Sequence, residues 1–507
     1  MGLLSKSKSK SPLSYPRYIY PLAAFIFLSL FLLFQVHSYV SRTKTIAGHN
    51  LEPTPWQIFP DKEKSNFETG YTKASKVIQC SYFKCGSGNS FPVQDKLSMP
   101  SNHAEKCPDF YRWIHHDLEP WHNTRISLAH LLAAKNTAAA FRIVIIDGRL
   151  YVDSYYGCVQ SRSLFTVWGF VQLLRRYPGQ VPDVDLMFDC MDKPVINRTE
   201  HALWPFPLFR YCTSAGHYDI PFPDWSFWGW AEVNISPWDE EFKSIKRGAN
   251  SKSWKKKIPY AYWKGNPDVV SPIRLELLKC NDTELWGASI MRQNWTEEST
   301  HGFSKSKLSN QCKNRYKIYA EGYAWSVSLK YILSCGSVPL IIHPEYEDFF
   351  SRGLFPKKNY WPISPTNLCE SIKYAVEWGN TNAGQAEAMG KAAQDLMESI
   401  SMDGIYDYMY HLINEYAKLL DFKPVRPPTA LEVCYDSLLC YADDKKRAFL
   451  ERSTAFPSLN PPCKLPPRDT NFIQSWMEKK SKIIEETEVV PPKPEEPPKV
   501  EESFKIP

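Results

Sequence analysis

Carboxylates gathered around one short apolar run are the residues of this chain best placed to do chemistry. Asp183 and Asp185 stand at the start of the run 181–194, and Asp192 lies near its end. A carboxylate just past the carboxyl end of a buried strand can accept a proton from an attacking hydroxyl group, so Asp192 is a candidate general base. The alternative is turn chemistry, because Asp is also a common loop residue.

Asp183 and Asp185 also match the Asp-x-Asp pattern with which some enzymes hold a divalent metal on a nucleotide. Such triplets are frequent, and both carboxylates here stand at or before the start of the predicted strand rather than after its end. A metal-dependent reaction through this pair is therefore the weaker alternative. We expect no metal site, since the cysteines are scattered and no Cys-x-x-Cys pair occurs.

Two other segments carry groups suited to an anionic ligand. The run 260–274 joins a strand, a glycine turn and a helix start, and its Lys264 and Arg274 could neutralise a diphosphate. The run 316–342 places a turn of small residues between a strand and a helix, an arrangement that directs backbone N–H groups at an anion such as a nucleotide diphosphate. Each segment taken alone is equally compatible with an ordinary loop of an α/β core.

The elements that must position these groups alternate along the chain in two halves, separated by a charged stretch, 243–257. This alternation predicts two α/β domains with parallel sheets and a ligand site at the carboxyl ends of their strands. The predicted strands are 140–146, 185–189, 258–263 and 338–342, and the predicted helices are 126–134, 164–177, 326–333 and 385–413, the last with a break at 401–404.

Residues 18–36 form an uncharged apolar segment of about the length needed to cross a bilayer. Lysines and an arginine precede it, which predicts a cytosolic N-terminus and a lumenal remainder. A cleaved signal peptide is the rival interpretation, but the segment lacks a clear small-residue cleavage site. We therefore predict a cytosolic tail (1–17), a signal anchor (18–36) and a lumenal stem (37–105).

The rest of the chain fits a protein of the secretory pathway. It contains 13 cysteines, of which Cys80, Cys85 and Cys107 suggest local disulfides in the stem, and it contains N-glycosylation sequons. The C-terminus is not a retrieval signal, which favours the Golgi membrane over the endoplasmic reticulum. A net charge of +6 without a basic stripe gives no indication of nucleic acid as a partner.

In combination and in order, these segments resemble the Rumi-type protein O-glucosyltransferases and the related fungal capsule-associated xylosyltransferases. The similarity runs from about Asp147 to about Tyr416, and the residues at 147–152, 262–265 and 320–326 resemble those of plant members. It implies a GT-B-like pair of Rossmann-like domains, a donor such as UDP-glucose or UDP-xylose, inversion at the anomeric carbon and no metal cofactor. The domains would be 106–257 on the acceptor side, 258–425 for the UDP-sugar, 426–484 as an extension and 485–507 as a disordered tail.

The resemblance also assigns roles to residues. Asp192 matches the catalytic base of the family, and Cys312 and Cys335 match a family disulfide. Acceptor contacts map onto Ser161 and Arg162 and onto Asn234 to Pro237, which includes Ser236. Donor contacts map onto Lys264, Gly265, Asn266, Arg274, Gly322, Tyr323, Ala324, Trp325, Ser326, Val327, Ser328 and Lys330.

Two departures from the family concern the donor diphosphate. Ser328 replaces the arginine that closes the donor segment of the family, and Lys264 replaces another arginine. Lysine is not an equivalent bidentate donor, so either nearby cations such as Lys330 and Arg315 compensate or the donor differs. The resemblance thus implies an inverting transferase acting on a protein or glycan hydroxyl, and the alternative is a lumenal sugar-nucleotide or glycan-binding protein whose site has decayed.

Overall fold

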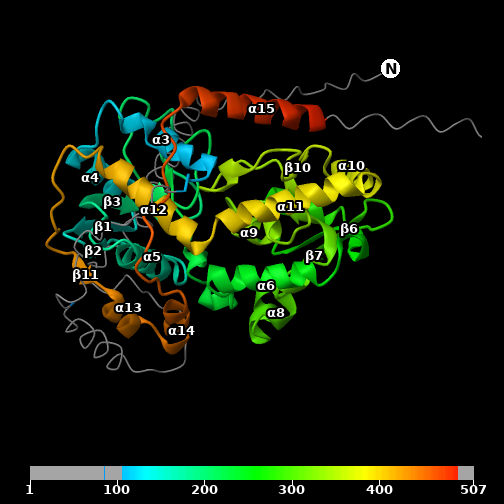
Figure 1. Cartoon of the computed structure of the whole chain (residues 1–507), viewed down its shortest axis with the longest axis horizontal. Helices are drawn as coiled ribbons and strands as arrows, with labels where there is room; N and C mark the ends of the chain where they lie inside the picture. Colours follow the sequence, from blue (N-terminus) through cyan, green and yellow to red (C-terminus); the bar gives the residue numbers. More distant parts are fainter. Residues whose placement is uncertain (1–84, 86–104, 489–507) are drawn as a thin grey trace, which may run out of the picture. The chain divides into compact units, whose positions relative to one another are not determined.

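The computed structural model describes Cys85 and residues 105–488, and it contains two β-sheets with helices around them (Figure 1). Within this described part, no helix is both long and apolar enough to cross a membrane. The predicted cytosolic tail 1–17 and signal anchor 18–36 lie outside the described residues, as does nearly all of the stem, so the anchor stays a prediction. The last helix, α15 (Thr470–Glu488), continues into the range predicted as a disordered tail.

The first sheet is mixed, so the prediction of parallel strands in this half was wrong. β1 (Phe141–Ile146) pairs antiparallel with both β2 (Arg149–Ser154) and β3 (Val184–Phe188). The physical reason is the turn at Asp147 and Gly148, whose φ angles are 50° and 71°. A turn of this kind joins antiparallel neighbours, whereas parallel neighbours need a crossover of about a dozen residues or more.

The complete strand order of this sheet is β11-β2-β1-β3-β4-β5, and β4 and β5 run parallel to β3. Every residue of β3 is buried, because helices α4 and α12 pack against it. The predicted helices near 126–134 and 164–177 are present as α4 and α5. The bounds are Phe209–Arg210 for β4, Ile220–Pro221 for β5, Leu431–Val433 for β11, Leu128–Thr137 for α4, Arg162–Arg176 for α5 and Met402–Ala417 for α12.

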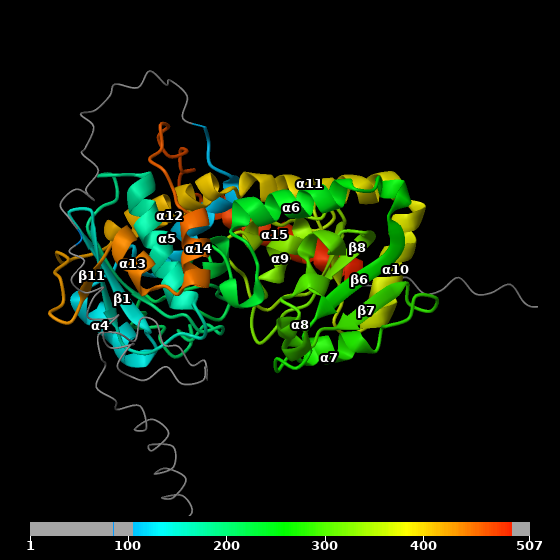
Figure 2. The ribbon, with the colours of Figure 1, turned by 90° about the horizontal axis from the view of Figure 1, so that it is seen from below.

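The second sheet is parallel throughout, as predicted, with the order β10-β9-β8-β6-β7. Figure 2 shows β6 between β7 and β8. Helices α10 and α11 pack against this sheet, and short helices α7 and α9 connect strands. The bounds are Ile258–Gly265 for β6, Ala288–Arg292 for β7, Asn314–Tyr319 for β8, Val338–Ile342 for β9, Trp361–Ile363 for β10, Pro272–Leu278 for α7, Ser328–Leu333 for α9, Leu368–Thr381 for α10 and Ala383–Ser399 for α11.

After the second sheet the chain returns to the first. The helix break predicted at 401–404 occurs at 400–401, between α11 and α12, and residues 402–404 already belong to α12. Ser401 caps α12 by accepting a hydrogen bond from the Gly404 N–H at 3.3 Å. β11 then extends the first sheet, and α13 (Tyr435–Tyr441) and α14 (Asp444–Arg452) follow, with α13 against α5 (Figure 2). α15 finally packs against β10 of the second sheet. The C-terminal segments thus contact both sheets.

Disulfides link segments that are far apart in the sequence. Cys85 pairs with Cys434 and Cys107 with Cys463, so the prediction of local disulfides in the stem was wrong for these two residues. The prediction failed because it considered only neighbours in sequence, whereas the returning C-terminal segments bring their partners. The family pair Cys312–Cys335 is confirmed, and Cys158–Cys190 and Cys280–Cys369 complete the bridges between described residues.

Candidate active site

Asp192 lies on the loop that follows β3, and its side chain is 32% exposed. Arg162, the first residue of α5, donates a 2.7 Å hydrogen bond from Nη1 to Asp192 Oδ1. The guanidinium of Arg162 also stacks on the Trp225 ring, with its carbon 4.3 Å from the ring centroid. The carboxylate is therefore oriented by a cation that is itself fixed, while part of it remains open to solvent.

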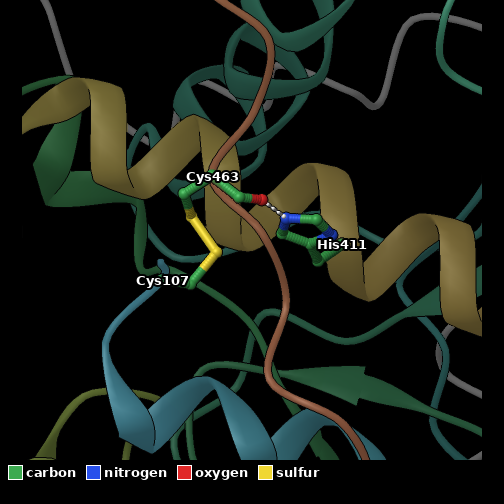
Figure 3. A group of neighbouring side chains, drawn as sticks. All are labelled: Cys107, His411 and Cys463. Atoms are coloured by element: carbon green, nitrogen blue, oxygen red, sulfur yellow. Dashed lines mark hydrogen bonds between the residues drawn. A yellow bond between two sulfur atoms is a disulfide. The ribbon is translucent and has the colours of Figure 1, made fainter. Parts of the chain in front are cut away.

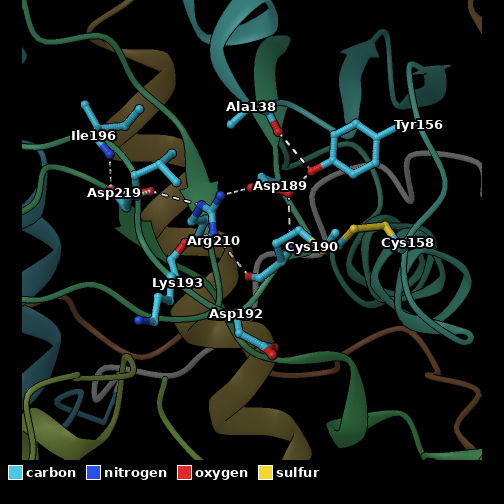
Figure 4. Close-up of polar contacts among 12 residues, drawn as sticks. Ala138, Tyr156, Cys158, Asp189, Cys190, Asp192, Lys193, Ile196, Arg210 and Asp219 are labelled. Carbon is cyan, nitrogen blue, oxygen red and sulfur yellow. Dashed lines mark hydrogen bonds and ion pairs between the residues drawn. A yellow bond between two sulfur atoms is a disulfide. The ribbon is translucent and has the colours of Figure 1, made fainter. Parts of the chain in front are cut away.

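A buried ion-pair network holds the loop that carries Asp192 (Figure 4). Arg210 of β4 pairs with Asp189 on one side and, through Nε at 3.1 Å, with Asp219 on the other. Asp219 in turn accepts a 2.8 Å hydrogen bond from the Ile196 N–H. All three side chains are at most 2% exposed, so the pairing is what makes their burial possible.

In the same loop, each backbone carbonyl of residues 190–193 accepts a hydrogen bond. The Cys190 carbonyl accepts from Arg162 at 3.1 Å, and the Asp192 carbonyl accepts from the Cys212 thiol at 3.1 Å. The carbonyls of Met191 and Lys193 both accept from Arg210. Because the Cys158–Cys190 disulfide adds a covalent link to the segment before α5, the loop is pre-organised.

Asp183 and Asp185 are occupied by structural contacts. Asp185 is fully buried and forms a two-pronged ion pair with Arg142 of β1, and Asp183 accepts a 2.8 Å hydrogen bond from the Asp147 N–H. The two carboxylates therefore stabilise the β1–β3 pair and the β1–β2 turn. These contacts give both carboxylates a structural role.

Among the described residues, Cys107, His411 and Cys463 form a group of potential metal ligands whose ligand atoms all lie within 4.8 Å of one another. Figure 3 shows that the two sulfurs form a disulfide, while His411 Nε2 lies 2.7 Å from the Cys463 carbonyl oxygen. A sulfur in a disulfide is not a thiolate ligand. The group therefore ties α12 to the C-terminal segment and is not a metal centre.

The predicted donor segment, 322–328, follows the carboxyl end of β8 and leads into α9. Arg274 of α7 lies beneath it and is 9% exposed. Its Nη2 donates to the Ala320 carbonyl at 3.1 Å and to Ser326 Oγ at 3.3 Å, and its Nη1 donates to the Asn266 carbonyl at 2.8 Å. Arg274 thus joins the loops after β6 and β8, the two loops predicted to hold the donor.

Other residues of the predicted donor site are also paired. Lys264 Nζ donates to Glu298 Oε1 at 2.7 Å and to Ser306 Oγ at 2.8 Å. Ser328, in place of the family arginine, makes a 2.9 Å hydrogen bond with Ser326. Gly265 lies under the Trp263 ring, where a Cβ would come within 2.5 Å of ring carbon, so only glycine fits.

The two cations named as possible substitutes for the family arginine at Ser328 are both engaged in other contacts. Lys330 is 1% exposed and pairs with Asp224 at 2.9 Å. Arg315 stands at the start of β8, the opposite end of the strand from the donor segment, and donates to Asn380 and to the Lys255 carbonyl. Both side chains stabilise packing instead.

Two carboxyl groups next to the donor segment are weaker acids than usual, because burial raises their pKa. Burial raises the pKa of Glu321 to about 7, although its carboxylate accepts hydrogen bonds from the N–H groups of Glu345 and Tyr346. Burial likewise raises the pKa of Asp348 to about 7. Glu321 fixes the loop after β9 to the loop after β8, so its protonation state bears on the shape of the donor segment.

The structure brings the Asp192 loop and the donor segment together. The ammonium of Lys193 lies 4.5 Å from the ring centroid of Tyr323, and the ring of Trp325 packs against Tyr211 at a centroid distance of 5.7 Å. The backbone of Thr213 pairs with that of Glu347 through two 2.9 Å hydrogen bonds. The two sheets therefore present their candidate residues to one another across a fixed contact.

The predicted acceptor residues lie at the start of α5 and directly after the short helix Ala231–Val233. Ser161 Oγ donates to Glu232 at 2.8 Å, and Asn234 Nδ2 lies 3.4 Å from the Gly302 carbonyl. Ser236 accepts a 3.1 Å hydrogen bond from Arg452 of α14. Arg162 is the acceptor-side residue that contacts Asp192, through the 2.7 Å hydrogen bond described above.

Sequence reasoning missed Arg210, Asp219 and Lys193. Arg210 had a usable signal, because a charged residue inside the apolar run 206–212 must be paired when that run is buried. Asp219 lies beside Arg210 only because β3, β4 and β5 pair in that order. This order cannot be predicted from the sequence. Lys193 follows Asp192 directly in the sequence, and a single lysine in a loop gives no signal of its own.

Fold and site together define an α/β protein of two sheets in which a carboxylate loop of one sheet meets a segment of the other that is suited to an anion. Residues 102–490 match Glycosyl transferase family 90, and the chain belongs to this family. It is 28% identical to Protein O-glucosyltransferase 1 of Homo sapiens and 27% identical to that of Bos taurus, each over 340 residues that cover 64% of this chain and 83% of the relative. It is 23% identical to O-glucosyltransferase rumi of Drosophila melanogaster over 327 residues, 62% of this chain and 78% of the relative.

Proposed function

We propose that this protein transfers a glucosyl or xylosyl unit from a UDP-sugar to a hydroxyl group of a protein or glycan, with inversion at the anomeric carbon. The two sheets would act as the halves of a GT-B-like fold. The observation that carries the proposal is the meeting of the Asp192 loop with the donor segment, marked by the 4.5 Å contact of Lys193 with Tyr323. Family membership and the names of the relatives support sugar transfer to protein.

In the proposed reaction, Asp192 takes the proton of the acceptor hydroxyl while its oxygen forms a bond to the anomeric carbon. The bond from that carbon to the diphosphate oxygen breaks, and UDP leaves on the opposite face with the bonding electrons. Arg162 keeps the Asp192 carboxylate oriented through its 2.7 Å hydrogen bond. The proton stays on Asp192 until solvent removes it.

The segment 322–328 and the loop 264–266 would bind the donor. Arg274 links the two through its hydrogen bonds to backbone carbonyls. Arg274 is 9% exposed, so its main contribution is to shape this surface. We propose that no metal takes part, and full activity in EDTA would support that view. Loss of activity in EDTA that is restored by a divalent metal would contradict it.

The test of the proposal is a panel of UDP-sugars offered to the purified full chain without any acceptor. Hydrolysis of UDP-glucose or UDP-xylose, recorded as released UDP, is the expected result, because water can replace the acceptor hydroxyl. Hydrolysis of neither sugar nucleotide, together with no transfer to protein or glycan acceptors, would contradict the proposal. The panel also identifies the sugar.

A second candidate function is a sugar-nucleotide or glycan-binding protein that has lost catalysis. The observation that favours it is the state of the cations near the donor segment, since Lys264 and Lys330 are neutralised by Glu298 and Asp224 and Ser328 carries no charge. UDP binding without turnover of any UDP-sugar would favour this function. Measurable turnover would exclude it.

We further propose that the protein is a single-pass type II protein of the Golgi membrane with a lumenal catalytic part. Residues 18–36 would form the anchor. The disulfides support an oxidising compartment, because such bridges rarely persist in the cytosol. Protection of the catalytic part from protease in intact Golgi vesicles would support this topology.

A further inference from the structure

We propose that Lys193 is the residue that binds the donor diphosphate, and that it reaches the diphosphate from the sheet opposite to the donor segment. The inference rests on the proposed function and deepens it. Asp192 and Lys193, neighbours in the chain, would then serve the two ends of the reaction. Asp192 would receive the acceptor proton, and Lys193 would stabilise the charge on the leaving group.

The position of Lys193 is the first argument. Its side chain is exposed, and its ammonium lies 4.5 Å from the ring centroid of Tyr323, which is 47% exposed at the donor segment. A cation above an aromatic face is held near that face without losing its charge or its hydrogen-bond donors. The ammonium is thus placed at the surface where the segment of one sheet meets the loop of the other.

The second argument is that the neighbouring cations are already engaged. Arg162 pairs with Asp192, Arg210 with Asp189 and Asp219, and Lys330 with Asp224. Lys264 pairs with Glu298, and Arg274 donates to backbone carbonyls beneath the segment. Among the described residues, by contrast, Lys193 has no carboxylate in an ion pair with it. Its charge is therefore available to a ligand.

The third argument is the rigidity of the loop. The carbonyls of residues 190–193 are all held by hydrogen bonds, two of them by the buried Arg210. In Figure 4 the Lys193 ammonium and the Asp192 carboxylate extend from this loop in different directions. The two side chains therefore keep apart, and the ammonium does not neutralise the carboxylate that must accept a proton.

The chemistry requires such a cation. When the bond between the anomeric carbon and the diphosphate oxygen breaks, the electron pair stays on that oxygen, and the diphosphate gains negative charge. A protonated lysine at hydrogen-bond distance stabilises this charge without giving up its proton. The same cation strengthens binding of UDP but contributes nothing to binding of uridine, which has no phosphate.

The experiment measures the dissociation constants of UDP and uridine for the full chain and for three variants by calorimetry. Lys193→Met removes the charge and keeps a long side chain, and Lys193→Arg keeps the charge. Lys391→Met is the matched control, because Lys391 is a 72% exposed lysine on α11 whose partner Asp395 is on the same helix. Thermal unfolding of each variant confirms that it is folded.

We expect Lys193→Met to weaken UDP binding about tenfold, the effect of one hydrogen bond to a charged group, and to leave uridine binding unchanged. The loss should shrink as salt rises, Lys193→Arg should retain most of the affinity, and Lys391→Met should match the wild type. UDP affinity within twofold of wild type in Lys193→Met, or an equal loss for uridine, would overturn the inference. If wild type still hydrolyses a UDP-sugar in that case, the proposed function stands; if wild type neither binds UDP nor hydrolyses UDP-sugars, both fail.

Discussion

At the scale of single residues, the site depends on which charges are paired and which are left open. Most charged side chains near the contact of the two sheets are paired, including Arg210 with Asp189 and Asp219. Asp192 keeps an exposed edge although it is paired with Arg162. Because buried charges without partners are costly, the pairing explains why so many charges can gather here.

Glu321 gives a prediction about pH at this scale. Burial raises its pKa to about 7 from an ordinary value of 4.5, so the folded protein holds this proton more tightly than the unfolded chain does. The stability gained from the protonated form is fully present below pH 4.5 and is lost as the pH rises through about 7. We therefore expect Glu321→Gln, which stays neutral, to gain stability relative to wild type as the pH rises.

The measurement is the melting temperature of both proteins between about pH 5 and pH 8, since the linkage acts over this window. Glu377→Gln is a suitable control, because Glu377 is 64% exposed on α10. A difference between Glu321→Gln and wild type that does not change with pH would show that the carboxyl group does not titrate as described.

At the scale of elements, the proposal assigns the donor and the base to three loops, and these loops depend on two buried arginines. Arg274 joins the loops after β6 and β8, and Arg210 holds the loop after β3. We expect Arg274→Ala to lower the stability by on the order of 3 kcal/mol, because the carbonyls of Ala320 and Asn266 lose a charged donor. UDP binding should weaken as well, since both loops lose their shape.

Arg315→Ala is the control for Arg274→Ala. Arg315 also donates to a backbone carbonyl, but it does so at the opposite end of β8. Denaturant unfolding and UDP titration of both variants separate the two effects. Equal UDP affinity in the two variants would mean that Arg274 does not shape the donor surface.

For the loop that carries Asp192, we expect Arg210→Met to cost about 3–5 kcal/mol, because Asp189 and Asp219 would be left buried without a counter-charge. Arg468→Met removes only an exposed pair with Glu119 and should cost less than about 1 kcal/mol. Denaturant titration measures both. A similar, small cost in the two variants would contradict the structural role given to Arg210.

The positions of strands and helices along the chain were predicted better than the pairing of these elements in space. The predicted strands at 258–263 and 338–342 are present, and the predicted helix break occurs at 400–401, because hydrophobic periodicity and turn residues are local signals. The antiparallel β1–β2 pair was missed, although Asp147 and Gly148 directly follow the predicted strand 140–146. The partner of Arg210 could not be predicted, because it depends on strand order.

At the scale of the whole molecule, disulfides join segments from the two ends of the described chain. Cys107 is joined to Cys463 across 356 residues, and Cys85 to Cys434 across 349. α12 and β11 add to the first sheet, and α15 packs against the second. Contacts from both ends of the described chain therefore help to hold the two sheets in the arrangement that brings Asp192 near the donor segment. The sequence carries the cysteines but not their pairing, and for this reason the stem disulfides were predicted incorrectly.

The central claim is that Asp192 is the base of a transferase whose donor is bound by other residues. Asp192→Asn keeps the shape of the side chain but removes the group that accepts the proton. The direct test measures UDP-sugar turnover and UDP affinity of this variant in the same preparation. We expect turnover to fall by at least about a hundredfold while UDP affinity stays within a few fold of wild type. Turnover near the wild-type rate, or loss of UDP binding together with turnover, would contradict it.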